Sequence, residues 1–381
     1  MNDIRISQDQ ANERLIKRAD YVSCSVAFID CKTPGSHLKE NYAMIGPGVT
    51  SSADQVINLR EPHGFNVGAA AMPHGITNNL HIHFTAEVFL VFKGTWKFRW
   101  GPNGDDGEII GHAGDIVSMP TWIFRGFTNI GVDDGWVFTA LGGNDTGGII
   151  WHPNILNGAA EHGLYLTKDN ILVDTSKGTP KPDESALIRP ISASEIASLR
   201  HYSFSEMRQR VMARDERVWS HEALLDSCLP GHASEMAPVI GFGISQDRNH
   251  QPKITNPHGF SIEWLKLAPG QSVSRFRVAE KQVLINHAGS VAITLNEPGA
   301  EAVMPLAGWD TASIPANAWR SIRNVSDSTA EIVVMTAGDH RKPPEWAPDV
   351  LAAVAAHGRG VDKSGFIAPA HLLPGYAMGK M

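Results

Sequence analysis

Residues 75–94, GITNNLHIHFTAEVFLVFKG, are the most informative stretch of this 381-residue chain. In a β-strand, side chains of equal parity share one face, so His81, His83 and Glu87 can all point the same way. Two imidazoles and one carboxylate on one face form a set of three ligands for a first-row transition metal. An isolated His-x-His pair would more simply be two polar strand residues. With Glu87 in register, the pattern favours a metal site.

The chain also repeats itself at an offset of 195 residues, which needs no gap between residues 62 and 129. Pro62-His63-Gly64-Phe65 returns as Pro257-His258-Gly259-Phe260, because 62 + 195 = 257. The same offset relates Gly75 to Gly270, Gly94 to Gly289, Asp115 to Asp310, Pro120 to Pro315, Arg125 to Arg320 and Asn129 to Asn324. Most of these residues set turns, so the sequence predicts two copies of one β-rich unit.

Short segments with β-branched or aromatic residues, bounded by Gly, Pro, Asn or Asp, predict an all-β fold. Helix signals fall between the copies, where Ser192 and Ser203 each begin a capping-box pattern. We therefore expect four regions along the chain. They are an N-terminal unit over 1–165, a helical linker over 166–215, a C-terminal unit over 216–345, and a helix and tail over 346–381.

Composition excludes several classes of partner. The net charge is −7 and no block of Lys and Arg occurs, which argues against nucleic acid or an anionic membrane. No apolar stretch is long enough to span a bilayer, and the N-terminus has no signal-like apolar region. The three cysteines lack C-x-x-C spacing, which fits reduced thiols. We expect a cytoplasmic protein with no membrane partner.

The spacing Gly75-x5-His81-x-His83-x3-Glu87-x6-Gly94 resembles the first motif of the cupin superfamily at every fixed position. The second motif follows in altered form, with Gly114-x5-Pro120 and Asn129 in place. The resemblance covers about 60–145 and, through the repeat, about 255–340. It implies two tandem cupin barrels (double-stranded β-helix, or jelly-roll, barrels) with a few connecting helices. One divalent metal would lie in the N-terminal barrel, on His81, His83 and Glu87.

Two positions depart from the second motif: Trp122 stands where a glycine is usual, and Arg125 stands where the family has a fourth ligand, a histidine. A guanidinium stays protonated and cannot replace imidazole as a ligand. Arg125 could instead hold a substrate carboxylate or phenolate beside the metal. Alternatively it is structural, as Arg320 in the other copy suggests. His74 and His112 are the nearest candidates for a fourth ligand.

The C-terminal copy has lost the ligand set, because Phe276, Val278 and Gln282 occupy the corresponding positions. We expect this barrel to serve as scaffold and interface, and the protein to form a homo-oligomer.

Aromatic and apolar residues flank the predicted site in the N-terminal copy. Phe89 and Val91 continue the inward parity of the ligands and should line a substrate cavity. Trp122 and Phe124 flank Arg125 and could form its mouth. Core packing is the simpler interpretation for each of the four. Their number favours an apolar or aromatic substrate over a sugar. With Arg125 included, we expect a small-molecule substrate that is aromatic or anionic.

Three functions are compatible with these residues. The first is an Fe(II) dioxygenase that cleaves an aromatic or enolic compound, since the chain resembles gentisate-type and flavonol-cleaving bicupins. The second is a non-oxidative isomerase, lyase or decarboxylase that uses the metal as a Lewis acid. The third is a non-enzymatic binding cupin. The ligands favour Fe(II) under the first hypothesis and also suit Mn(II), Ni(II), Co(II) or Zn(II).

Overall fold

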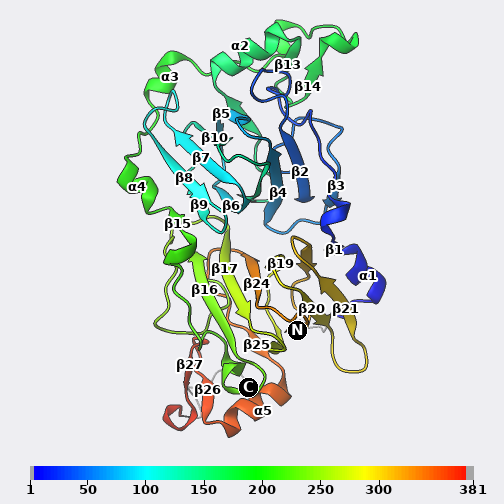
Figure 1. The fold of residues 1–381 in the computed structure, drawn as a ribbon, viewed down its shortest axis with the longest axis vertical. Helices are drawn as coiled ribbons and strands as arrows, with labels where there is room; N and C mark the ends of the chain where they lie inside the picture. Colours follow the sequence, from blue (N-terminus) through cyan, green and yellow to red (C-terminus); the bar gives the residue numbers. More distant parts are fainter. Residues whose placement is uncertain (1–3, 375–381) are drawn as a thin grey trace. The chain divides into compact units, whose positions relative to one another are not determined.

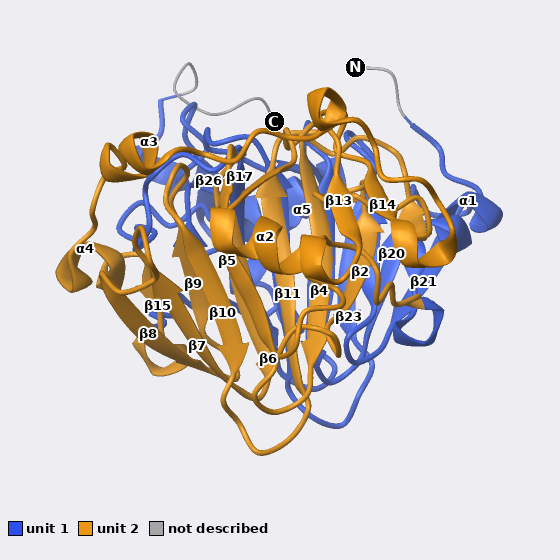
Figure 2. Cartoon of the chain, turned by 90° about the horizontal axis from the view of Figure 1, so that it is seen from above, with its two compact units in different colours: residues 1–20, 217–381 blue, residues 21–216 orange. Residues whose placement is uncertain are grey.

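The computed structural model describes residues 4–374, which form mainly antiparallel β-sheets (Figure 1). Strand β7 (Thr95–Trp100) shows why these sequences form strands: its three aromatic side chains are buried and the residues between them are partly exposed. This alternation is the period of a strand with one face toward a core. The chain divides into two compact units, coloured in Figure 2. One comprises Tyr21–Glu216, and the other comprises the residues up to Asp20 together with those from Arg217 onward.

The Tyr21–Glu216 unit is built from two main sheets. The seven-stranded sheet runs in the order β15 (Val211–Met212), β9 (Ile116–Met119), β6 (Glu87–Lys93), β11 (Gly135–Gly142), β4 (Phe65–Met72), β2 (Glu40–Ile45) and β3 (Ile57–Leu59). The five-stranded sheet runs in the order β12 (Ile149–Trp151), β5 (Thr77–His83), β10 (Arg125–Asn129), β7 and β8 (Gly107–His112). An apolar core that includes Phe89, Phe98 and Phe127 contains side chains from both sheets.

The second unit repeats this plan. Its six-stranded sheet runs in the order β1 (Leu15–Ile16), β22 (Thr311–Ile314), β19 (Gln282–Ala288), β24 (Ala330–Ala337), β17 (Phe260–Leu267) and β16 (Ser234–Ile240). Its five-stranded sheet runs in the order β21 (Ala302–Leu306), β20 (Val291–Leu295), β23 (Arg320–Asn324), β18 (Ser272–Arg277) and β25 (Glu345–Trp346). The bounds of β4 and β17 differ by the repeat offset, since 65 + 195 = 260 and 72 + 195 = 267. The predicted duplication is therefore confirmed as two jelly-roll barrels.

Helices are few and short. They are α1 (Gln8–Glu13), α2 (Pro153–Glu161), α3 (Ala193–Ala197), α4 (Phe204–Arg208) and α5 (Pro348–Ala356). Two hairpins complete the fold, β13 (Leu164–Leu166) with β14 (Leu172–Asp174), and β26 (Arg359–Val361) with β27 (Ile367–Pro369). Within residues 4–374, no helix combines the length and the apolar character that a bilayer span requires.

The N-terminal arm differs from our expectation. We assigned residues 1–165 to one barrel, but β1 pairs with β22, so the arm joins the C-terminal barrel. The segment that we expected to be a linker contributes β15, which pairs with β9 of the N-terminal barrel. The segment before the first repeat thus adds an edge strand to the second barrel, and the segment between the repeats adds one to the first barrel. The reason is that an edge strand offers backbone hydrogen bonds to any segment of suitable length.

Candidate metal centre

The three predicted ligands lie on two strands that belong to different sheets of the N-terminal barrel. His81 and His83 are at the end of β5, and Glu87 is the first residue of β6. Strand parity turns both imidazoles to one face of β5, whereas Leu80 and Ile82 pack on its other face. All three ligands are buried, and at most 5% of each residue is exposed.

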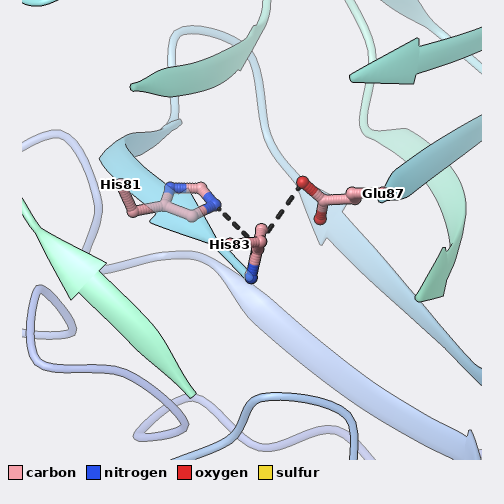
Figure 3. A group of neighbouring side chains, drawn as sticks. All are labelled: His81, His83 and Glu87. Atoms are coloured by element: carbon pink, nitrogen blue, oxygen red, sulfur yellow. Dashed lines mark hydrogen bonds and ion pairs between the residues drawn. The ribbon is translucent and has the colours of Figure 1, made fainter. Parts of the chain in front are cut away.

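The ligand atoms converge (Figure 3). Nε2 of His81 lies 3.0 Å from Nε2 of His83, and the latter lies 3.5 Å from Oε2 of Glu87. With metal–nitrogen bonds of about 2.1 Å, two neighbouring ligands are separated by about 3.0 Å in an octahedron and about 3.4 Å in a tetrahedron. Among the described residues, this is the group of histidine, cysteine and carboxylate side chains that could hold a metal ion.

The hydrogen bonding of His81 suits a metal ligand. Its Nδ1 lies 2.6 Å from the carbonyl oxygen of Asn79, so Nδ1 carries the proton and donates it to that oxygen. The lone pair of a neutral His81 is then on Nε2, which is the atom that faces His83. Such a bond fixes the tautomer and the ring orientation of metal-binding histidines.

Electrostatics keep all three groups in the form that binds a cation. Burial lowers the pKa of His81 well below its usual value, and His83 beside it acts in the same direction. Burial also lowers the pKa of His83, although Glu87 opposes this shift. Burial alone would raise the pKa of Glu87, but His83 and Arg125 outweigh it and lower that pKa to about 2. Two neutral imidazoles and one carboxylate therefore meet here at neutral pH.

A cavity of about 50 Å³ opens beside the three ligands. Polar side chains form much of its lining: Lys39, Asn41, Tyr42, Asn66, Asn78 and Thr139. The sequence analysis missed these residues, because they precede the first cupin motif or carry no ligand spacing. No local signal in the sequence could have placed Lys39 beside His81.

Arg125 lies behind Glu87 and is not among the residues that line the cavity. Its Nη2 donates to the carbonyl oxygen of Pro120 at 2.6 Å, and its Nε lies 4.0 Å from Oε2 of Glu87. Burial lowers its pKa to about 10, against the opposing effect of Glu87, so it stays charged at neutral pH. The geometry therefore supports an interaction with Glu87 and gives no support to direct contact with substrate.

The other copy shows what this arginine does without a ligand set. Arg320 also hydrogen-bonds the backbone, donating to the carbonyl oxygen of Ala318, and its Nη1 donates to Oε1 of Gln282. Gln282 takes the place of Glu87, while Phe276 and Val278 are buried in the apolar core of this barrel. In both barrels the arginine at this position thus interacts with the side chain that begins the equivalent strand, β6 or β19.

The four expected cavity residues lie elsewhere. Phe89 and Val91 are buried in the apolar core of the barrel, where Phe89 packs 4.8 Å from Phe98 between ring centroids. Phe124 packs with Leu80 and Ile82, on the face of β5 that points away from the ligands. None of them lines the cavity. Strand parity predicts which face a side chain is on, but it does not predict whether that part of the face borders a cavity or is filled by packed side chains.

Trp122 is also outside the cavity lining, with half of the residue exposed. Its φ of 57° explains why a glycine is usual at this place, and Asn317 of the other copy has a φ of 60°.

The candidate fourth ligands are not part of the cluster either. His74 is exposed and its Nδ1 lies 2.6 Å from the carbonyl oxygen of Gly131, and His112 is exposed at the end of β8.

No protein-family model matches the sequence, and no curated protein matches it. Solved structures do match. The oxalate decarboxylase of Lactobacillus farciminis, in its formate complex, has a TM-score of 0.55 at 11% identity and covers 89% of this chain and 90% of its own. The chain has the bicupin fold. Vicilin from Capsicum annuum matches with a TM-score of 0.53 at 11% identity over 88% of both chains.

Oxalate decarboxylase from Bacillus subtilis matches this chain with a TM-score of 0.52 at 10% identity, over 94% of this chain and 83% of its own. At such low identities the likeness establishes the fold alone. It does not show the expected resemblance to gentisate-type or flavonol-cleaving dioxygenases.

Acidification should destabilise the metal-free protein through this cluster. Because the pKa values of His81 and His83 are lowered from 6.5, the unfolded chain binds more protons than the folded one below that pH. Their contribution to stability is complete above pH 6.5 and is lost as the pH falls. We expect the free energy of unfolding in urea to drop between pH 7.5 and 5.5, and to drop less in His81→Gln. The exposed His340→Gln should behave like the parent, and an equal drop in His81→Gln would contradict the prediction.

Proposed function

We propose that this bicupin is a metal-dependent enzyme that acts on a small molecule in the cavity of its N-terminal barrel. One observation carries the proposal: the Nε2 atoms of His81 and His83 meet Glu87 in a buried cluster beside a cavity. A cluster of this kind costs stability unless a cation or a proton joins its members. His81, His83 and Glu87 would hold one divalent metal.

The metal would have three protein ligands. An octahedral ion keeps up to three further positions for water or substrate, and it would act as a Lewis acid that polarises a bound oxygen. The chain's own residues orient the site. Asn79 fixes the tautomer of His81, and Arg125 favours the ionised form of Glu87. Neutral imidazole and carboxylate suit Mn(II), Fe(II), Co(II), Ni(II) or Zn(II) and do not single out iron.

A non-oxidative reaction (isomerisation, elimination or decarboxylation) fits the cavity best. The four residues that favoured a phenolic or flavonol substrate do not line it. Its walls combine apolar side chains, among them Phe127 and Ile149, with several polar ones and a buried lysine. A volume of about 50 Å³ also favours a compact substrate over a polycyclic one. Lewis-acid polarisation of a carboxylate or carbonyl oxygen is the chemistry that such a site supports.

An Fe(II) dioxygenase is the second candidate, and Arg125 is the observation that favours it. Because Arg125 stands where a fourth ligand would be, substrate and dioxygen could bind the ion together. We also propose, from the sequence alone, that the protein forms a homo-oligomer and is cytoplasmic.

The two reactions differ in their need for oxygen. The chain should be purified with and without air, its metal identified by elemental analysis, and each preparation tested against small hydroxy, keto and dicarboxylic acids and against phenols. We expect turnover that is independent of oxygen. Oxygen uptake in step with product formation would establish the dioxygenase instead, and a metal-loaded protein that turns over neither panel would favour a binding function.

Metal content tests the ligands directly. His81→Ala, His83→Ala and Glu87→Ala each remove one of three protein ligands, so metal per chain should fall well below that of the parent in elemental analysis. Val278→Ala and Gln282→Ala are the matched controls in the other barrel, and they should leave metal content unchanged. Full occupancy in two of the three ligand variants would place the metal elsewhere.

Arg125→His tests whether this arginine occupies a coordination position. The change removes a cation next to the metal and supplies a third imidazole as a fourth protein ligand, so metal affinity should rise at least tenfold in competition with a chelator. Arg320→His is the matched control, because Phe276 and Val278 cannot ligate. It should add no second metal equivalent and should lower the melting temperature. Loss of metal from Arg125→His would instead mean that Arg125 is needed to hold Glu87.

A further inference from the structure

Lys39 is a buried cation in the same cavity as the three ligands. It lies directly before β2, only 4% of the residue is exposed, and it lines the cavity together with His81, His83 and Glu87. Burial of a lysine is rare unless its charge is compensated. Neither the proposed metal ligation nor the repeat accounts for it.

The contacts of Lys39 leave it one donor. Its Nζ donates to Oδ1 of Asp30 at 2.7 Å and to Oδ1 of Asn78. The rings of Phe28 and Trp151 lie 5.0 and 5.9 Å away and add cation–π attraction. An ammonium has three N–H donors, and the third has no partner among the described residues. Since Lys39 lines the cavity, a ligand there can accept that bond.

The other barrel tests whether Asp30 requires this lysine. The backbone N–H of Ser274 donates to Asp226 at 2.6 Å, and that of Asn79 lies 3.5 Å from Asp30, where 79 + 195 = 274. Asp226 is therefore the counterpart of Asp30, and it is equally buried. The aspartate holds the backbone of the neighbouring strand in both copies.

The counterpart of Lys39 is a serine. Glu40 pairs with Ala71 and Glu235 pairs with Lys266, and 71 + 195 = 266, so Lys39 corresponds to Ser234. The barrel without ligands thus keeps the aspartate and lacks the lysine. There Nδ1 of His232 lies 3.4 Å from Asp226, so the aspartate has a different partner and the fold does not require a lysine in particular. The barrel that has His81, His83 and Glu87 has Lys39 in this role.

Charge balance indicates what the cavity would accept. Lys39 offsets Asp30, and Arg125 offsets Glu87, so the four side chains sum to zero. A divalent ion on the three ligands would leave two positive charges uncompensated in a buried place. An anionic ligand that reaches both the ion and Lys39 would neutralise them.

We propose that Lys39 is the anchor that makes this cavity select an anionic substrate, by donating its third N–H to a carboxylate or enolate oxygen of the metal-bound molecule. This inference rests on the proposed metal site and names its substrate class. Lys39 would contact the substrate directly, and Asp30 and Asn78 would hold its ammonium in position.

The test uses the full chain loaded with Mn(II) and titrated by calorimetry with acetate, malonate and oxalate, with malonamide as the neutral comparison. The parent should bind at least one of the anions and bind malonamide more weakly. Lys39→Met should weaken anion binding at least tenfold, because a charge-assisted hydrogen bond is lost. Its metal content should match that of the parent.

Two further variants separate anchoring from folding. Lys39→Met leaves Asp30 buried without a counter-charge, so the double variant Lys39→Met with Asp30→Asn removes both charges and should regain melting temperature without regaining anion affinity. Lys342→Met removes the buried lysine of the other barrel and should leave anion binding unchanged. Anion affinity within twofold of the parent in both Lys39 variants, or no anion binding by the metal-loaded parent, would overturn the inference. A parent that binds no metal would overturn the proposed function instead.

Discussion

Two imidazole nitrogens that face each other across 3.0 Å inside a barrel need a proton or a cation between them. A neutral His83 can place its own Nε2 proton there, but burial lowers the pKa values of both rings, so an additional proton that would charge the pair is costly. A divalent cation can instead bind the Nε2 lone pairs of both neutral rings. Glu87 adds the negative charge that such a cation requires. The other features of the site follow from this one requirement, including the tautomer set by Asn79 and the arginine beside the carboxylate.

The duplicated barrel provides an internal comparison for each of these features. Where the ligands are missing, Phe276 and Val278 pack in the core, and the glutamine that replaces Glu87 hydrogen-bonds Arg320. That barrel keeps the buried arginine on a neutral glutamine and on backbone carbonyl oxygen, whereas the N-terminal barrel places Arg125 next to the charged Glu87. The persistence of the arginine in both copies indicates a role in the barrel itself, and the presence of Lys39 in one copy indicates a role in the cavity.

The cavity lining also changes the chemistry that the fold is expected to perform. Aromatic residues near the motif first favoured an aromatic substrate, but Phe89 and Phe124 are buried away from the cavity. Lysine, asparagine and threonine side chains line it together with apolar residues such as Phe127. Small anions satisfy a site of this kind better than extended ring systems, since they can neutralise a buried ion and accept hydrogen bonds.

The sequence by itself determined the β-rich repeat, the loss of ligands from the second copy and the common face of His81 and His83, whereas Glu87 joins them from a strand of the other sheet. These features depend on local spacing and on strand parity, both of which can be read along the chain. Only the tertiary structure decided that β1 joins the other barrel, that Phe89 packs away from the cavity and that Lys39 lies beside the ligands. Pairing partners and packing depth depend on residues far apart in sequence, and no local period records them.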